Sequence, residues 1–212
     1  MPDQPTIVLL PARRTVEAVS VLRDAFQSDP IFRFHFPDAV LRASVLEIFF
    51  TNVIRAHLRF RHVYAALDGN RVVGAAVWHP PIVTTESLLD RLRAIIMRRR
   101  LMALAPDAAK RLLAGFAALE ATHPRAPHWY LFFIGLDRAL RGRGLGARLM
   151  APVLEIADAT RSLCYLETPF PQTIAFYKTL GYEVSSEPHP FPGAPQLWAM
   201  TRQPSAIGAQ PQ

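Results

Sequence analysis

The stretch from Leu131 to Met150 constrains what this chain can fold into more than any other part of the sequence. It consists of an apolar run, a short polar turn with glycines at positions 142, 144 and 146, and a helix-prone segment. A glycine has no Cβ atom, so a ligand can approach its backbone closely. The free N–H groups and the positive end of a following helix favour a phosphate at such a turn. The stretch therefore predicts a strand, a pyrophosphate-binding turn and a helix.

Length and composition indicate a single folded domain, which we place at residues 1–202. Of the 212 residues, 50% are hydrophobic and 10% aromatic, which is enough to bury a core. Residues 203–212 are rich in proline, glycine and glutamine, and we expect them to form a disordered tail. No window holds the roughly 20 apolar residues of a membrane helix, so we expect no membrane partner. With one cysteine, Cys164, and no signal-peptide pattern at the start, we expect a cytoplasmic protein.

The chain is basic, with a formal net charge of +7 and a pI near 10.3. Such a charge could attract nucleic acid, an anionic membrane or an acidic cofactor. The basic residues are spread along the chain, with one dense run at Arg98–Arg100. A solvated helix face explains that run more simply than a nucleic-acid site, so nucleic-acid binding is kept only as an alternative.

The pattern of apolar residues and breakers predicts alternating helices and strands. The predicted elements are, in order, a strand at 6–10, a helix from 15, a helix at 41–60, a hairpin at 62–67 and 71–78, helices over 84–123 with a break at 105–107, a strand at 129–136, a helix at 142–159, a strand at 163–167, a helix at 173–180, and strands at 182–185 and 196–202. Asp68-Gly69-Asn70 is a strong hairpin turn signal, and Gly181 is expected to cap a helix in the left-handed conformation. The order indicates an α/β or α+β sheet protein whose helical insertion, about 84–126, covers the sheet as a lid or cap.

A P-loop does not fit the glycine turn, and a dinucleotide-binding fold fits it only in part and is kept as a less favoured alternative. A P-loop needs lysine and then serine or threonine after the last glycine, but Ala147-Arg148 stands there. A dinucleotide-binding (NAD(P)) fold accepts the pattern from Gly142 to Ala147, and Glu167 lies where its ribose-binding carboxylate belongs. However, residues 137–141 separate the strand from the first glycine, and the 45 residues after Glu167 are too few for the remaining strand–helix units.

The third class is an acyl-coenzyme A site. The segment Arg141-Gly142-Arg143-Gly144-Leu145-Gly146 resembles the R/Q-x-x-G-x-G/A loop of the GCN5-related N-acetyltransferase (GNAT) superfamily. The apolar run before it is similar to the family's fourth strand. Residues 165–168 and 175–184 are similar to its fifth strand and its "fY…GF" segment. Within the family the chain looks closest to the puromycin-acetyltransferase-like branch.

This resemblance implies a mixed, mostly antiparallel central sheet with helices on both faces. It also implies transfer of an acetyl group from acetyl-CoA to a primary amine of a small molecule or peptide, by direct attack. The residues that the resemblance places against coenzyme A are Ile134, Leu136, Arg141, Gly142, Arg143, Gly144, Leu145, Gly146, Ala147, Thr173 and Phe176. The main chain of the fourth strand and the N–H groups from Arg141 to Ala147 would make these contacts. Thr173 departs from the family pattern, because many members carry asparagine there.

Two residues are candidates for the chemistry. Tyr177 stands where the family's general acid stands, and a phenol can protonate a departing thiolate with little penalty. Otherwise it is a packed aromatic residue. Glu167 is the candidate general base, because a carboxylate at the end of an apolar strand needs a task or a partner. Alternatively, Glu167 forms a salt bridge to an arginine. The base is then Tyr130 acting through water, or water alone.

The acceptor side is less defined by the sequence. Candidate acceptor-binding residues are Phe32, Phe34, Trp78 and Tyr130, together with the insertion and the loop 188–195. The alternating Phe32, Phe34 and Phe36 are either core or a pocket wall. The histidines show no metal-ligand spacing, so no metal is expected. The different-class alternative is a non-catalytic acyl-CoA-binding or nucleic-acid-binding module. The chain is expected to be a monomer or a homodimer.

Overall fold

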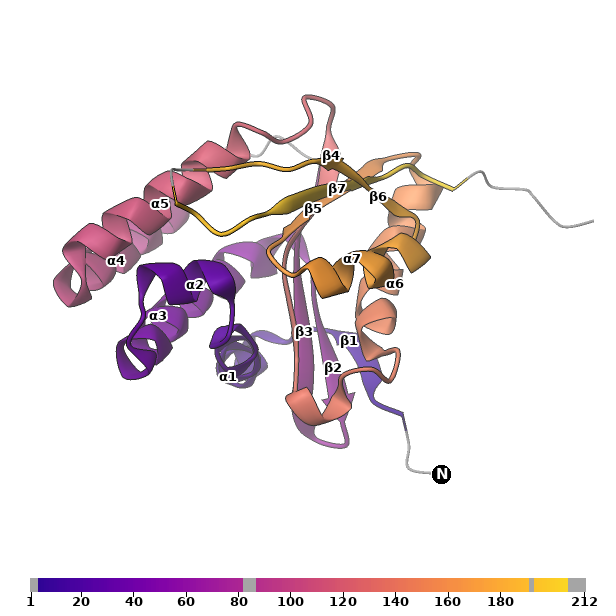
Figure 1. Cartoon of the computed structure of the whole chain (residues 1–212). Helices are drawn as coiled ribbons and strands as arrows, with labels where there is room; N and C mark the ends of the chain where they lie inside the picture. The colour runs from indigo at the N-terminus through magenta and orange to yellow at the C-terminus, as the bar shows by residue number, and fades with distance from the viewer. Residues whose placement is uncertain (1–3, 82–86, 191–192, 206–212) are drawn as a thin grey trace, which may run out of the picture.

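The computed structural model describes residues 4–81, 87–190 and 193–205. A seven-stranded sheet with the order β1-β2-β3-β4-β5-β7-β6 runs through the molecule (Figure 1). Its strands are β1 (Thr6–Leu9), β2 (Val63–Asp68), β3 (Arg71–His79), β4 (His128–Leu136), β5 (Leu163–Thr168), β6 (Tyr182–Ser186) and β7 (Trp198–Arg202). Only the pair β4–β5 is parallel, and the other five pairs are antiparallel. The predicted mixed, mostly antiparallel sheet is confirmed.

Helices cover both faces of this sheet, as predicted. They are η1 (Ala12–Arg14), α1 (Thr15–Phe26), α2 (Pro30–His35), α3 (Ala39–His57), η2 (Leu58–Phe60), α4 (Leu88–Leu104), α5 (Pro106–Glu120), η3 (Arg138–Leu140), α6 (Leu145–Ala159) and α7 (Pro171–Thr179). Helices α1 to α5 gather on one side of the sheet, and α6 and α7 lie on the other (Figure 1). Alternating side chains of the strands therefore enter two separate cores.

The first core is built from phenylalanines on the side of α1 to α5. Phe133 of β4 packs edge-to-face against Phe26, Phe49 and Phe50, with ring centroids 5.4, 5.5 and 5.1 Å away. Edge-to-face packing is the arrangement that the ring quadrupoles favour. The second core lies under α6 and α7, and its fully buried members include Trp78. Strand β4 contributes to both cores, so it is held firmly on its two faces.

Helix α2 follows α1 directly because Asp29 and Pro30 begin a new helix there. The Asp29 carboxylate accepts hydrogen bonds from the N–H groups of Ile31 and Phe32, at 2.9 and 3.1 Å, and Pro30 occupies the first turn. Phe32 and Phe34 thus lie on a helix, and Phe36 follows its last residue. Phe32 and Phe36 are buried in the first core, whereas Phe34 is 43% exposed.

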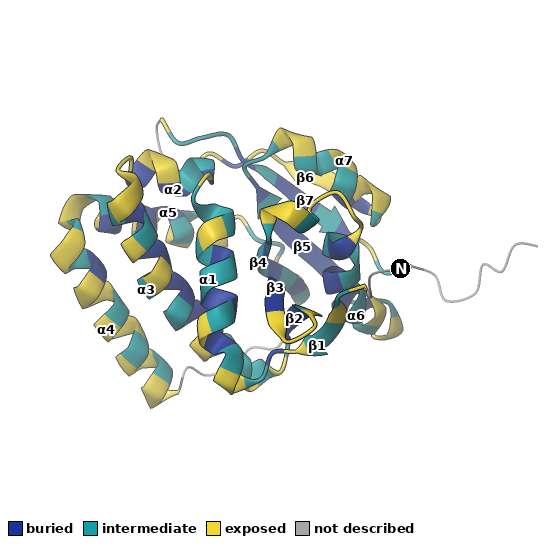
Figure 2. Ribbon diagram, turned by 90° about the horizontal axis from the view of Figure 1, so that it is seen from below, coloured by how far each residue is buried: buried dark blue, intermediate teal, exposed yellow. Residues whose placement is uncertain are grey.

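The helical insertion forms an outer layer on this side of the molecule. Helix α5 reaches the sheet, because the Phe116 ring lies 6.4 Å from that of Phe132 in β4 and stacks on Phe49 of α3 at 5.4 Å. Helix α4 packs on α3 and α5 instead, and its outward side remains exposed along its length (Figure 2). The insertion therefore covers α3 as much as the sheet. Its first residues, up to 86, lie outside the described residues.

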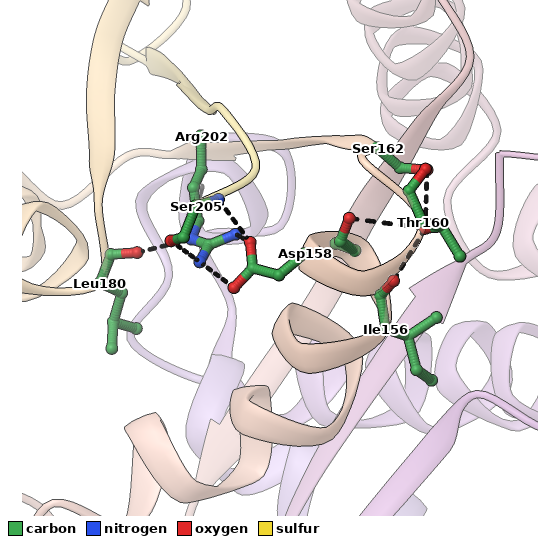
Figure 3. A network of polar contacts seen from close by, with 8 residues as sticks. Ile156, Asp158, Thr160, Ser162, Leu180, Arg202 and Ser205 are labelled. Atoms are coloured by element: carbon green, nitrogen blue, oxygen red, sulfur yellow. Dashed lines mark hydrogen bonds and ion pairs between the residues drawn. The ribbon is translucent and has the colours of Figure 1, made fainter. Parts of the chain in front are cut away.

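The side chain of Arg202 joins the last strand, β7, to α6 and to the end of α7 (Figure 3). Its guanidinium donates to both carboxylate oxygens of Asp158 in α6, at 2.7 and 2.8 Å, and to the carbonyl of Leu180 at 2.8 Å. The N–H of Ser205 donates to the same carboxylate at 2.7 Å. Gly181 adopts φ +85° beside this arginine, which confirms the predicted helix cap. The predicted tail beyond Ser205 lies outside the described residues.

Candidate active site

Strands β4 and β5 pair over only a short length and then separate. Their parallel register joins His128 to Leu163 and ends with Tyr130 opposite Tyr165. Strand β4 continues to Leu136, still paired with Gly74 of β3 on its other edge. Residues 131–136 of β4 therefore have an edge that β5 does not cover. An uncovered edge carries free N–H and C=O groups that can pair with an extended ligand.

The groups that face this gap can be assigned by alternation along the strand. The N–H of Asp137 donates to the carbonyl of Val73 in β3, at 2.8 Å. Because successive residues of a strand direct their main-chain groups to opposite edges, Ile134 and Leu136 direct theirs toward the gap. A register shift opposite Val77 and Trp78 leaves Phe132 as an extra residue on β4. Ile134 and Leu136 are the two residues that the sequence predicted to pair with coenzyme A.

The glycine turn that follows β4 is open to solvent. Gly142 and Gly144 adopt φ +75° and +74°, and a Cβ atom placed on either would meet nothing within 4 Å. Side chains rarely adopt this backbone conformation, which explains the two glycines. Helix α6 begins at Leu145, later than the predicted Gly142, because these left-handed residues cannot continue a helix.

The N-terminus of α6 presents free donors at this turn. The N–H of Arg148 is bonded to the carbonyl of Gly144 at 3.2 Å, so the N–H groups of Leu145, Gly146 and Ala147 precede the first turn of helical bonds. The N–H of Arg141 instead donates to the carbonyl of Arg138 at 3.4 Å. The prediction that Arg141 offers its N–H to a pyrophosphate is therefore wrong for the main chain, while its side chain remains exposed.

Helix α7 closes one side of the turn. A Cβ atom on Gly146 would lie 3.2 Å from the tip of the Phe176 ring, so a larger residue there would push the ring aside by a few tenths of an ångström. The Thr173 hydroxyl donates to the carbonyl of Phe170 at 2.8 Å and lies 2.9 Å from the hydroxyl of Thr168. Thr173 thus shapes the start of α7, and its predicted contact with coenzyme A stays a prediction.

A cavity of about 470 Å³ opens between the end of α1 and the glycine turn. Its walls include Asp24 and Ser28 on one side and Leu136, Arg138 and Arg141 on the other. The cavity connects the free edge of β4 with two guanidinium groups. The lining also includes the carboxylates of Asp24 and Asp137, so its formal charges balance. The size of the cavity suits part of an extended ligand, and the guanidinium groups of Arg138 and Arg141 are the groups in it that can bind a phosphate.

Glu167 lies on the opposite face of β5 from the second core. Its side chain is 6% exposed, and its Oε1 atom lies 3.1 Å from Nε2 of His123. His123 belongs to the loop between α5 and β4. The sequence offered an arginine as the alternative partner of Glu167, and the observed partner is a histidine. Sequence reasoning missed it because the contact joins positions 44 residues apart.

Tyrosines surround this pair. The His123 ring lies 4.5 Å from that of Tyr130 and 4.7 Å from that of Tyr165. Burial, and then the charge of Glu167, hold the pKa of the Tyr130 phenol well above its usual range. The same two causes raise the pKa of Tyr165. Both phenols therefore keep their protons at neutral pH. Tyr130, a predicted acceptor-binding residue, does lie next to Glu167.

Four histidines meet on this side of the sheet. The rings of His57 and His79 are 5.6 Å apart, and those of His123 and His128 are 5.5 Å apart. Burial lowers the pKa of His57 to about 4, so its imidazole is neutral. Among the residues that the structure describes, no group of three or more His, Cys, Asp or Glu side chains could hold a metal ion.

Tyr177 lies on the other side of β5, in the second core. Its ring contacts those of Phe176 and Tyr182 at 5.1 and 6.0 Å, and the residue is 7% exposed. Burial raises the pKa of its phenol, which therefore stays protonated. A general acid must carry its proton at working pH, and Tyr177 meets this condition.

Two predicted acceptor-binding residues belong to the core instead. Trp78 is fully buried under α6, and Phe32 is 2% exposed within the phenylalanine cluster. Neither presents a surface to a ligand, so the prediction that they line an acceptor pocket is wrong. Aromatic residues fill cores and pockets alike, and the sequence pattern does not distinguish the two. Phe34 is exposed but packs beside His35.

A sequence model of the Acetyltransferase (GNAT) family matches residues 22–182. The matched range runs from α1 to β6 and contains the divergent strands, the glycine turn and Tyr177. The chain belongs to the GNAT family. It is therefore an acyltransferase of a family whose members use acetyl-CoA as the acyl donor.

Solved structures agree with the GNAT fold. A Corynebacterium glutamicum protein described as histone acetyltransferase HPA2 and related acetyltransferase superposes with a TM-score of 0.68 at 22% identity, covering 98% of this chain and 100% of its own. An agmatine N-acetyltransferase gives 0.65 at 17%, covering 95% and 100%. A Drosophila melanogaster polyamine N-acetyltransferase gives 0.55 at 17%, covering 94% and 99%. At these identities the likeness concerns the fold, and the puromycin-acetyltransferase-like branch stays a prediction.

Proposed function

We propose that this GNAT domain transfers the acetyl group of acetyl-CoA to a primary amine of a small molecule, or of a peptide. The observation that carries the proposal is the uncovered edge of β4, which leads directly into the exposed glycine turn at the start of α6. Agmatine and polyamine acetyltransferases share this fold, which favours a small amine as the acceptor.

The cofactor side would be held mainly by main-chain groups. Ile134 and Leu136 would pair with the amides of the pantetheine arm, as a neighbouring strand does. The free N–H groups at the start of α6 would bind the pyrophosphate, and the side chains of Arg141 and Arg143 would add charge-assisted bonds. When bound, acetyl-CoA supplies the acetyl group as a thioester.

Glu167 and Tyr177 would then act from opposite faces of β5. The Glu167 carboxylate takes the proton of the attacking amine, and the Tyr177 phenol protonates the departing thiolate. Burial of Tyr177 makes its phenol a weaker acid. A thiolate that leaves into the same dry surroundings is a stronger base than in water, so the two shifts offset each other.

The acceptor would approach Glu167 from the side of the insertion. Tyr130 lies at this carboxylate and is the first candidate for contact with the amine. Phe34 and the loop 188–195 remain candidates, although residues 191 and 192 of that loop lie outside the described residues. The single cysteine, Cys164, is buried and unpaired, which fits the reducing cytoplasm that we propose as its compartment. None of the helices in the described part of the chain is long and apolar enough to cross a membrane.

The test is release of free thiol from acetyl-CoA with a panel of small amines and peptides. Wild-type protein should release thiol with at least one amine, and Tyr177→Phe should lower kcat by about 100-fold, as loss of an acid catalyst does. Tyr182→Phe is the matched control, because Tyr182 is buried beside Tyr177 but lies on β6. Tight binding of CoA without turnover on any amine would favour a binding module instead.

A further inference from the structure

The buried carboxylate of Glu167 poses a question of proton exit. If Glu167 takes a proton from the amine, it must release that proton to solvent before the next turnover. Its side chain is only 6% exposed. Its Oε1 atom is buried and accepts no well-aligned hydrogen bond from the residues that the structure describes. A neighbouring group that can accept this proton and is more exposed than Glu167 offers it a path outward.

His123 is the more exposed partner of this carboxylate. Its Nε2 atom lies 3.1 Å from Oε1 of Glu167, and its side chain is 16% exposed, more than that of Glu167. The main-chain N–H of His123 donates to the carbonyl of Glu120 at 3.2 Å, so the residue lies in the turn that ends α5. The rings of Tyr130 and Tyr165 contact the imidazole and hold it against the carboxylate.

We propose that His123 relays protons from Glu167 to water. The inference rests on the proposed function. As the amine nitrogen bonds to the acetyl carbon and the carbon–sulfur bond breaks, Tyr177 protonates the thiolate and the amine proton passes to Glu167. His123 begins in the tautomer that carries its proton on Nδ1, so that Nε2 can accept the proton from Glu167. The resulting imidazolium releases its Nδ1 proton to water, and exchange through water then returns the remaining proton from Nε2 to Nδ1. The carboxylate and the neutral imidazole are thereby restored, with one proton released.

Three titratable neighbours of His123 keep the same protonation state during the proposed proton transfer. Tyr130 and Tyr165 remain protonated, because burial holds the pKa of each phenol above its usual range. Burial also lowers the pKa of His128, whose ring lies 5.5 Å from that of His123, so this imidazole is neutral near pH 7.

The relay makes His123 a positioning and proton-transfer residue that does not touch the thioester. His123→Ala should therefore lower kcat by about 10- to 100-fold while leaving the KM for acetyl-CoA nearly unchanged. Imidazole added to the buffer should restore a large part of the lost kcat of His123→Ala, because it can take the place of the missing side chain. It should not activate wild-type protein or the double variant His123→Ala, Glu167→Gln.

His128→Ala is the matched control, since it removes a neighbouring imidazole on the same side of the sheet. Among the described residues, the ion pair of Glu167 is with His123 and not with His128. The control variant should neither lose kcat to a comparable degree nor respond to imidazole. Thermal unfolding of each variant shows whether the fold is kept. Should His123→Ala unfold, His123→Asn keeps a polar side chain and must show the same fall in kcat.

The outcomes separate the relay from the proposed function. An unchanged kcat in His123→Ala, or a loss that imidazole does not restore, overturns the relay while leaving acetyl transfer in place. Absence of thiol release by wild-type protein with every amine overturns both. A fall in kcat that imidazole reverses only when Glu167 is present establishes the relay.

Discussion

At the scale of single residues, the backbone conformation of Gly142 and Gly144 is the main support for the proposed coenzyme A site. Gly144 is the N-cap of α6 and adopts φ +74° in open space. A side chain there would be strained, and it would also stand where a pyrophosphate would meet the helix N-terminus. An ordinary phosphate-binding helix start needs only free N–H groups. The open, left-handed turn adds room for the phosphate to approach the backbone.

Gly144→Asp should abolish measurable binding of coenzyme A, with a loss of about 100-fold or more, since bulk and negative charge would face the pyrophosphate. Titration calorimetry with CoA measures this. Gly69→Asp is the control, because Gly69 has φ +55°, also meets nothing within 4 Å, and lies in the β2–β3 turn. Affinity that is equally reduced in both variants would point to loss of folding, and unchanged affinity in Gly144→Asp would contradict the phosphate site.

At the scale of elements, local patterns predicted the fold well and long-range contacts poorly. The hairpin of β2 and β3, the break between α4 and α5 and the cap at Gly181 all follow from residues adjacent in sequence. The partnership of His123 and Glu167 and the burial of Trp78 do not, because they arise from how the layers pack. Helix α6 begins at Leu145, later than the sequence pattern predicts, for a related reason. Helix propensity does not report that two glycines are needed in a left-handed turn.

The start of α2 offers a test of how an element depends on pH. Burial raises the pKa of Asp29 from its usual 3.8 to about 6, although its carboxylate caps the helix. In the folded state the group therefore holds its proton up to a higher pH than in the unfolded state. Its contribution to stability is fully present below the unfolded value of 3.8 and is lost as the pH rises through about 6, by up to about 3 kcal/mol.

Asp29→Asn keeps a side-chain oxygen for the cap and removes the buried charge. The variant should be more stable than wild type at pH 7.5 by about 2–3 kcal/mol, with the difference vanishing near pH 4. Chemical denaturation at both pH values measures this. Asp38→Asn is the control, because Asp38 caps α3 at 2.7 Å but is exposed. A loss of stability in Asp29→Asn at pH 7.5 would show that the cap needs the full carboxylate charge.

At the scale of the whole molecule, the basic charge and the outer helix α4 set how the chain meets its surroundings. The outward side of α4 carries apolar residues that are about half or more exposed, Leu88, Leu92, Ile95 and Ile96, beside the exposed run Arg98–Arg100. Helices α1 and α3 lie between α4 and the strands that lead to the glycine turn (Figure 2). The charges of α4 therefore act on a bound cofactor only over a long distance, whereas those of the glycine turn act directly.

This difference predicts how salt affects use of acetyl-CoA. With a net charge of +7, the chain should attract the anionic cofactor, so kcat/KM for acetyl-CoA should fall several-fold as salt rises from about 10 to 500 mM, with kcat little changed.

Replacing Arg98, Arg99 and Arg100 with glutamine lowers the net charge by three. Because the Debye length is about 8 Å at 0.15 M salt, this triple variant should resemble wild type there and differ only at low salt. Arg141→Gln with Arg143→Gln should instead raise the KM for acetyl-CoA at every salt concentration. If the α4 variant raised it equally at 0.15 M salt, the arginines of α4 would contact the cofactor, and the position assigned to the phosphate site would be wrong.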